Sequence, residues 1–268
     1  MSPVIRKSVR ANGIGHSWLE YGSAASPTLI IIPGITSPAI TWDATSRRLA
    51  EKFRVLTLDV RGRGESDHPV TGYTLADYSA DLAGIIEQLD IGAPAVLGHS
   101  MGARIAAAFA HEYPSLRGPV VVVDPPLTGP GRAPLPLPLD FYLDRIRAAR
   151  QARGVADMER FYPGWAPELV QRQIDALASC SQAAIIETYA SFHDEDFYAH
   201  WRHVTPPVLF VRGADSPMVK TDMVAELQST NPGAHMHTVP GAGHMVQWDN
   251  EDDFVAACTG FVLSQRCG

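Results

Sequence analysis

Five short apolar runs recur along the chain, and they constrain its fold more than any other feature. They occupy residues 29–32, 55–58, 95–97, 120–123 and 208–211. Runs that are apolar at nearly every position are typical of strands buried on both faces of a parallel sheet. Helical periodicity fills several of the intervals, at residues 46–51, 74–89 and 102–112. This alternation predicts an α/β fold with a doubly wound, mostly parallel sheet.

A β-hairpin is predicted ahead of this sheet. Residues 4–9 and 16–21 alternate between apolar and polar side chains, and Asn12-Gly13 lies between them. An Asn-Gly pair is favoured in the tight turns of hairpins, because both residues accept a positive φ.

The alternation of strands and helices stops after residue 123. Residues 125–138 are rich in proline, and residues 139–194 carry helical patterns without a strand, including 141–153 and 168–178. The segment contains many aromatic residues, which favours a packed unit over a disordered linker. We therefore expect a core formed by residues 1–124 and 204–268, with a helical cap at 125–203 inserted after the sixth strand.

Charge and composition limit the partners of the chain. The formal net charge is -7 and no run of Lys or Arg occurs, so the basic surface needed for nucleic-acid binding is not expected. The apolar runs are too short to span a bilayer, and the first residues lack the apolar stretch of a secretion signal. These features predict a cytoplasmic location without membrane attachment.

The cysteines give no sign of a structural cross-link. Cys180, Cys258 and Cys267 are odd in number and have no Cys-x-x-Cys spacing. This pattern argues against a disulfide framework and against a zinc site, and it suits a reducing compartment.

A candidate nucleophile lies in the segment Gly98-His-Ser-Met-Gly102. The segment follows a predicted strand and opens a predicted helix, which is the setting of the sharp turn that exposes a nucleophilic serine above a sheet. Ser100 is therefore the candidate nucleophile. The alternative is a helix-capping serine without a chemical role.

A serine hydroxyl needs a base, and His244 is the candidate among ten histidines. It lies in Pro240-Gly-Ala-Gly-His244, a glycine-rich turn between residues 235–239 and a predicted helix at 252–263. Loops that follow strands meet at the carboxyl edge of an α/β sheet, where the base could reach Ser100. The alternative is an ordinary surface histidine.

Two carboxylates could orient this histidine. Asp124 follows the run at 120–123, and Asp215 follows the run at 208–211. Both lie between Ser100 and His244 in the chain, so both satisfy the order Ser, Asp, His. Chain order leaves the choice open.

At this point the chain resembles the α/β-hydrolase superfamily along essentially its whole length. The resemblance is carried by Pro33-Gly-Ile, by residues 58–67, by the turn at 98–102 and by Gly241-Ala-Gly-His244. In most members the acid would fall at position 216, which is a serine here. Members with an Arg-Gly-Ala-Asp-Ser segment place the acid after the sixth strand instead, and this implies Asp124.

The resemblance also implies an oxyanion hole formed by the backbone N–H groups of Ile35 and Met101. Pro33 departs from the family, where a histidine is usual, although Pro33 is not itself a donor. The segment Arg61-Gly-Arg-Gly-Glu-Ser-Asp67 could bind an anion. We favour a loop tied down by its own polar residues, because similar strings occur in hydrolases with unrelated substrates.

Within the superfamily the chain is similar to bacterial deformylases of aerobic nicotinate breakdown. The similarity implies that N-formylmaleamate and water become maleamate and formate, without a metal or another cofactor. This small anionic amide would need a local positive or polar group in an acidic protein. Candidates are Thr36, Ser37 and three cap arginines, Arg132, Arg145 and Arg147, and the sequence does not choose among them.

Two other functions remain open from the sequence. An esterase or carbon–carbon hydrolase of a ring-cleavage product would use the same three residues. A non-catalytic ligand receptor could also be built on this fold. The oligomeric state is not indicated by the sequence.

Overall fold

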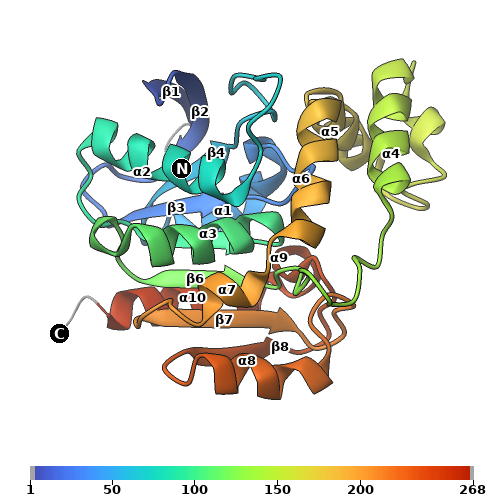
Figure 1. Ribbon diagram of the computed structural model, residues 1–268. Coiled ribbons are helices and arrows are strands. Elements are labelled where there is room, and N and C mark those ends of the chain that lie inside the picture. The colour runs from blue at the N-terminus through green and yellow to red at the C-terminus, as the bar shows by residue number, and fades with distance from the viewer. Residues whose placement is uncertain (1–3, 266–268) are drawn as a thin grey trace.

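The computed structural model describes residues 4–265, and its centre is a twisted eight-stranded sheet (Figure 1). The strand order is β1-β2-β4-β3-β5-β6-β7-β8, and every pairing from β4 to β8 is parallel. The strands are β1 (Ile5–Ala11), β2 (Ile14–Tyr21), β3 (Thr28–Ile32), β4 (Arg54–Asp59), β5 (Ala95–His99), β6 (Val120–Val123), β7 (Val208–Gly213) and β8 (His235–Val239). The predicted doubly wound, mostly parallel sheet is therefore confirmed.

The predicted hairpin forms one edge of this sheet. β1 pairs with β2 in antiparallel register from Ile5–Glu20 to Ala11–Ile14, and β2 pairs antiparallel with β4. Asn12 and Gly13 form the turn with φ angles of 52° and 78°. These left-handed values are those that a two-residue hairpin turn requires.

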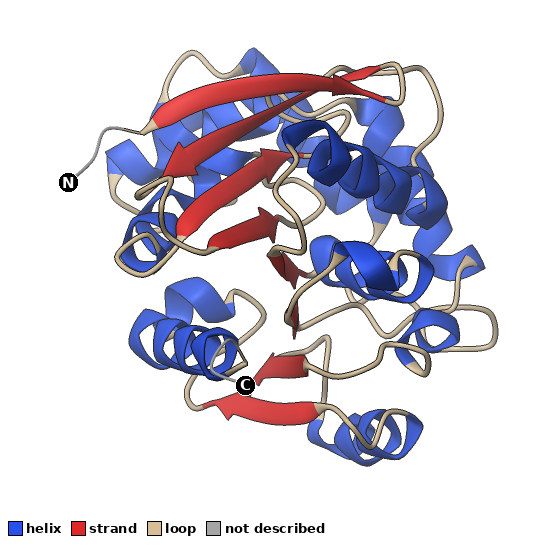
Figure 2. Ribbon diagram, turned by 90° about the vertical axis from the view of Figure 1, so that its left-hand side faces the viewer, coloured by secondary structure: helices blue, strands red, loops and turns tan. Residues whose placement is uncertain are grey.

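Helices cover both faces of the sheet (Figure 2). They are α1 (Asp43–Leu49), α2 (Leu75–Leu89), α3 (Met101–Glu112), α4 (Leu139–Gln151), α5 (Pro167–Ala178), α6 (Gln182–Asp194), α7 (Phe197–Trp201), α8 (Val224–Thr230), α9 (Val246–Asp249) and α10 (Glu251–Ser264). Thr74 and Asp77 form a capping box at the start of α2. The first helix begins at Asp43, three residues before the start that the sequence predicts, and Asp43 places a negative charge in its first turn.

Alternate residues of the buried strands enter two different cores. Ile30 and Ile32 pack with α2 and α3, whereas Leu29 and Ile31 pack on the other face with α1 and α10. Successive side chains of a strand point to opposite faces, so a strand buried on both sides must be apolar throughout. This explains the continuous apolar runs in the sequence.

The helices α4, α5, α6 and α7 lie between β6 and β7 in the chain, within residues 125–203. In Figure 1, α4, α5 and α6 stand beside the carboxyl ends of the central strands. The short α7 differs from them, because it packs on α3 and its Trp201 contacts Phe210 of β7. The part of the insertion that stands away from the sheet therefore ends before α7.

The structure also bears on the cysteines and on membrane-spanning segments. Cys180 and Cys258 are buried free thiols, while Cys267 lies outside the described residues. Across residues 4–265, no helix has both the length and the apolar character needed to cross a membrane.

Candidate active site

Ser100 occupies a strained turn between β5 and α3. Its φ and ψ angles are 57° and −117°, a backbone conformation that a residue with a side chain rarely adopts. The turn is tight enough that a methyl group on Gly98 would overlap the Gly102 carbonyl, and one on Gly102 would overlap the Ile32 carbonyl. The two glycines let the backbone turn sharply and leave the Ser100 side chain at the carboxyl edge of the sheet.

His244 and Asp124 complete a hydrogen-bonded line with this serine. The distance from His244 Nε2 to Ser100 Oγ is 3.0 Å, and that from His244 Nδ1 to Asp124 Oδ2 is 2.7 Å. Asp124 follows β6 and is fully buried, whereas the His244 side chain is one-fifth exposed. The structure thus brings together the three side chains that the sequence analysis selected.

The structure also separates the two candidate acids. The Asp215 residue is exposed, and its neighbour Ser216 is buried and donates a hydrogen bond to Asp124 Oδ2 at 2.5 Å. The position where most superfamily members would carry the acid therefore holds a hydroxyl that binds the carboxylate of Asp124. Of the two candidates, only Asp124 contacts His244.

His99 is a site residue that the sequence analysis did not select. It is 2 % exposed, its ring lies 4.8 Å from that of His244, and its Nε2 lies 2.9 Å from the His244 carbonyl. Burial, together with the neighbouring His244, lowers the pKa of His99 to about 3. A neutral His99 can donate from Nε2 and fix the backbone of His244. The only signal in the sequence was its place beside Ser100.

The expected oxyanion donors flank the nucleophile. Met101 is the first residue of α3, so its N–H has no acceptor within the helix. Gly34, directly before Ile35, lies against the serine, since a β-carbon there would be 3.5 Å from Ser100 Cβ. The backbone of Ile35 and the start of α3 are therefore placed on the same side of the site.

A cavity of about 340 Å³ opens over Ser100 and His244. The helical insertion supplies Phe141, Tyr142, Phe161, Tyr162 and Trp165, and the sheet side supplies Ile35, Met218, Met245 and Trp248. Thr36 and Ser37 also line it, as the sequence suggested. No Asp or Glu is found among the lining residues that the structure describes. The cavity is mainly apolar and suits a small ligand.

Of the three candidate arginines, only Arg145 lines this cavity. Its Nη2 donates to the Tyr162 hydroxyl, its Nε is buried without a hydrogen-bond partner, and no ion pair is recorded for it within residues 4–265. Arg132 is paired with Asp196 and Glu226, at 3.3 and 2.8 Å. Arg147 is exposed and paired with Asp144. Of these three arginines, Arg145 is therefore the one that lies at the cavity without a carboxylate partner among residues 4–265.

The segment at 59–67 is a tied-down loop, as we favoured from the sequence. The carboxylate of Asp59 accepts from the backbone of Ala39 and Glu65, at 2.7 and 3.2 Å, and its carbonyl accepts from Ser66. Arg61 binds the buried carboxylate of Asp81 and the Gly72 carbonyl. These groups satisfy one another within the protein.

The family model described as the alpha/beta hydrolase family matches residues 29–257 of this chain. The chain belongs to the alpha/beta hydrolase family. It is therefore an enzyme of the hydrolase class, and the alternative of a non-catalytic receptor is set aside. The predicted superfamily and its fold are confirmed.

Named relatives extend this result. The hydrolase is 37% identical to N-formylmaleamate deformylase of Pseudomonas putida over 257 residues, which cover 95% of each chain. It is 31% identical to 2-(acetamidomethylene)succinate hydrolase of Mesorhizobium japonicum, covering 91% of this chain and 90% of the relative. A crystal structure of N-formylmaleamic acid deformylase from Pseudomonas putida S16 superimposes with a TM-score of 0.90 at 33% identity, covering 95% and 100% of the two chains. The expected similarity to deformylases is thereby confirmed.

Proposed function

We propose that this hydrolase cleaves the formyl C–N bond of N-formylmaleamate to give maleamate and formate. The observation that carries the proposal is the line Ser100–His244–Asp124 facing a cavity that holds one unpaired cation, Arg145. The line suits acyl transfer, and the cation suits an anionic amide. The similarity to relatives named for such substrates supports the same assignment.

Acylation would begin at Ser100. Its Oγ attacks the formyl carbon while His244 Nε2 takes the proton, and Asp124 holds the imidazole and stabilises its protonated form. The carbonyl oxygen becomes negative and accepts from the N–H groups of Ile35 and Met101. Collapse breaks the C–N bond, and His244 gives its proton to the departing maleamate nitrogen. The neighbouring carbonyl already delocalises that nitrogen's electron pair, which helps it to leave.

Deacylation would repeat the sequence with water. His244 removes a proton from water, and the resulting hydroxide attacks the formyl ester on Ser100. Formic acid leaves as Ser100 regains its proton from His244, and it then ionises to formate by releasing one proton to water. Each proton and electron pair in these steps is handled by the three side chains and water, so the proposed mechanism uses no cofactor. We also propose that the enzyme works in the cytoplasm, as part of nicotinate breakdown.

Arg145 would bind the carboxylate of the substrate. Its guanidinium lies 5.2 Å from the ring centre of Phe141 and 5.1 Å from that of Tyr162, so aromatic rings shield it from water. The guanidinium lines the cavity, so a carboxylate bound there would lie beside its positive charge. This local charge would oppose the repulsion that a protein of net charge -7 exerts on an anion.

We propose that the part of residues 125–203 that carries α4, α5 and α6 acts as a cap. It contributes the aromatic side chains and Arg145 to the cavity above Ser100. A cap of this kind would exclude water from the formyl group and restrict the size of the substrate.

The alternative is an esterase or a carbon–carbon hydrolase of a ring-cleavage product, which the same three side chains could serve. Formate release from N-formylmaleamate should exceed, in kcat/KM, alcohol release from a short activated ester and cleavage of a ring-cleavage diketone. A higher kcat/KM on the ester or on the diketone would contradict the proposed reaction and favour that alternative.

The substrate contact is tested by Arg145→Gln with Arg147→Gln as the matched control, since both arginines lie on α4 and only Arg145 lines the cavity. We expect Arg145→Gln to lower kcat/KM for N-formylmaleamate by roughly 10- to 150-fold, because a charged hydrogen bond contributes about 1.5–3 kcal/mol. A neutral activated ester should be much less affected. If both substitutions changed kcat/KM for N-formylmaleamate equally, Arg145 would not be the residue that binds the substrate carboxylate.

A further inference from the structure

Arg63 is a buried guanidinium directly behind the expected oxyanion hole. It is 0% exposed, and its five N–H groups meet acceptors of the protein. The acceptors are the Ile35 carbonyl at 2.9 Å, the Arg61 carbonyl at 2.9 Å, the Tyr78 hydroxyl at 2.5 Å, the Met101 sulfur at 3.5 Å and the Thr188 hydroxyl at 3.2 Å. All five acceptors are neutral.

Arg63 has no carboxylate as an ion-pair partner in the described part of the chain. None of the ion pairs found between residues 4 and 265 includes Arg63, whereas Arg61 in the same loop is paired with Asp81. Burying an unpaired charge is costly, even when hydrogen bonds satisfy its donors. A positive charge held in this way also keeps its electrostatic effect on nearby groups, because water does not screen it.

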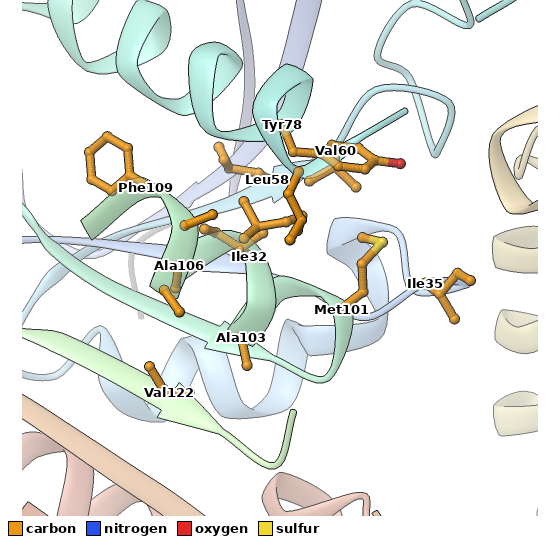
Figure 3. Close-up of a cluster of buried hydrophobic side chains, with 14 of the residues drawn as sticks. Ile32, Ile35, Leu58, Val60, Tyr78, Met101, Ala103, Ala106, Phe109 and Val122 are labelled. Atoms are coloured by element: carbon orange, nitrogen blue, oxygen red, sulfur yellow. The ribbon is translucent and has the colours of Figure 1, made fainter. Parts of the chain in front are cut away.

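The contacts of Arg63 lead to both residues of the oxyanion hole. One N–H binds the carbonyl of Ile35, and another contacts the side chain of Met101. Figure 3 shows Ile35 and Met101 at one end of the buried cluster, on the side toward which the Tyr78 hydroxyl points. The guanidinium therefore fixes two segments, 33–37 and the start of α3, relative to each other.

We infer that Arg63 is a positioning residue for the oxyanion hole, and that its charge favours the negative oxygen formed during attack by Ser100. The inference rests on the proposed serine mechanism. Because the charge on the oxygen appears only as the reaction proceeds, removing Arg63 should lower kcat and leave KM largely unchanged. If Arg63 only supported the fold, its removal would not lower kcat selectively while leaving KM unchanged.

Thr188 connects the same group to the helical insertion. Its hydroxyl lies on α6 and contacts both Arg63 and Tyr78, the latter at 2.6 Å. The hydrogen bonds therefore join the insertion to the backbone that would bind the oxyanion. Together with the four other acceptors, this contact holds Arg63 in one orientation.

The test compares Arg63→Gln and Arg63→Lys with Arg61→Lys as the matched control. Arg61 lies in the same loop and is also buried, but its side chain binds Asp81 and Gly72 and forms no hydrogen bond with Ile35 or Met101. Hydrolysis of a short activated ester is measured, with its dependence on Ser100 checked by Ser100→Ala. The affinity of a small alkylboronic acid, whose anionic adduct with Ser100 imitates the oxyanion, is measured beside it.

We expect Arg63→Gln to lower kcat by roughly 30-fold or more, with KM within about threefold of wild type. This loss is smaller than the roughly 10²- to 10³-fold that follows removal of a direct oxyanion donor, because Arg63 acts through the backbone. Boronate affinity should fall by a similar factor. Arg63→Lys should lose less, since it keeps the charge and one donor. If Arg63→Gln does not fold, the comparison of Arg63→Lys with Arg61→Lys decides the question.

The inference is overturned if folded Arg63 variants keep wild-type kcat and boronate affinity, or if Arg61→Lys lowers both to the same extent. Ester hydrolysis that depends on Ser100 does not require the proposed amide substrate. A failure to release formate from N-formylmaleamate would therefore refute the proposed reaction and leave the test of Arg63 intact.

Discussion

Ser100 and Asp124 both adopt left-handed backbone conformations, with φ angles of 57° and 46°. Such conformations cost of order 1–3 kcal/mol each for residues with side chains, so the surrounding sheet must hold them in place. The Ser100 N–H binds the Val123 carbonyl, and the Asp124 N–H binds the Val211 carbonyl. Neighbouring parallel strands therefore fix the two residues on which the proposed chemistry depends.

Replacing the two candidate acids tests this arrangement at single residues. Asp124→Ala should lower kcat by roughly 10³- to 10⁴-fold, because His244 loses the group that sets its tautomer and stabilises its charge. Asp215→Ala should stay within a few-fold of wild type, since the Asp215 side chain lies on the surface. Steady-state kinetics on variants shown to be folded would check this. A larger loss of kcat in Asp215→Ala than in Asp124→Ala would show that the catalytic acid lies in the loop after β7.

The sequence allowed Ser100, His244 and Asp124 to be predicted, the last by resemblance. It could not reveal the hydrogen bond from Ser216 to Asp124, because these residues are 92 positions apart and meet only when β6 and β7 pair. His99 was missed for a similar reason. Its effect on His244 depends on the ring contact across the site, and not on its position in the motif.

His99 gives the protein a specific dependence of stability on pH. In the unfolded chain its imidazole takes a proton near pH 6.5, whereas the folded protein keeps it neutral down to about pH 3. The unfolded state therefore binds more protons between these values, and the free energy of unfolding falls as the pH is lowered through this window. At pH values above about 6.5 the two states bind equally and this effect vanishes.

His99→Gln should remove this dependence while keeping an N–H donor for the His244 carbonyl. Between about pH 7 and pH 5, wild type should lose roughly 2 kcal/mol more stability than His99→Gln. Urea unfolding of both proteins at the two pH values measures the difference. If both proteins lost the same free energy of unfolding between the two pH values, His99 would not be held neutral in the folded protein, and this account of its burial would be wrong.

At the scale of elements, the buried strands were the most predictable parts of the chain. Their apolar runs follow directly from burial on both faces, as in β6, where all four valines are fully buried. The arrangement of the helices in residues 125–203 was harder to predict, because a helical pattern does not show whether that helix packs on the sheet or stands away from it. Trp201 and Phe210 are in contact only in the fold, so the place of α7 on the sheet was not predictable.

Replacing residues 131–194 with a Gly/Ser linker tests the proposed cap and keeps α7 on the sheet. Loss of Arg145 and of the aromatic lining should lower kcat/KM for N-formylmaleamate by roughly 100-fold or more, whereas a short activated ester should lose less. Circular dichroism must first show that the shortened protein is folded. Wild-type values on both substrates would mean that the segment is no cap.

At the scale of the whole molecule, the proposed enzyme combines a half-buried positive charge in the cavity, Arg145, with an overall excess of acidic residues. The net charge of -7 repels an anion at long range, and the unpaired Arg145 attracts it at short range. The sheet supplies the reacting groups from three loops, and the insertion supplies the walls of the cavity. Substrate selection and bond cleavage are thus assigned to different parts of one chain.

The central claim is that Ser100 of this fold cleaves N-formylmaleamate. The most direct measurement is formate release from synthetic N-formylmaleamate by wild type and by Ser100→Ala, with both proteins shown to be folded. We predict rapid release of one formate per substrate by wild type, and a loss of roughly 10⁴-fold or more in kcat for Ser100→Ala. Formate release by folded Ser100→Ala within a few-fold of wild type would contradict the claim.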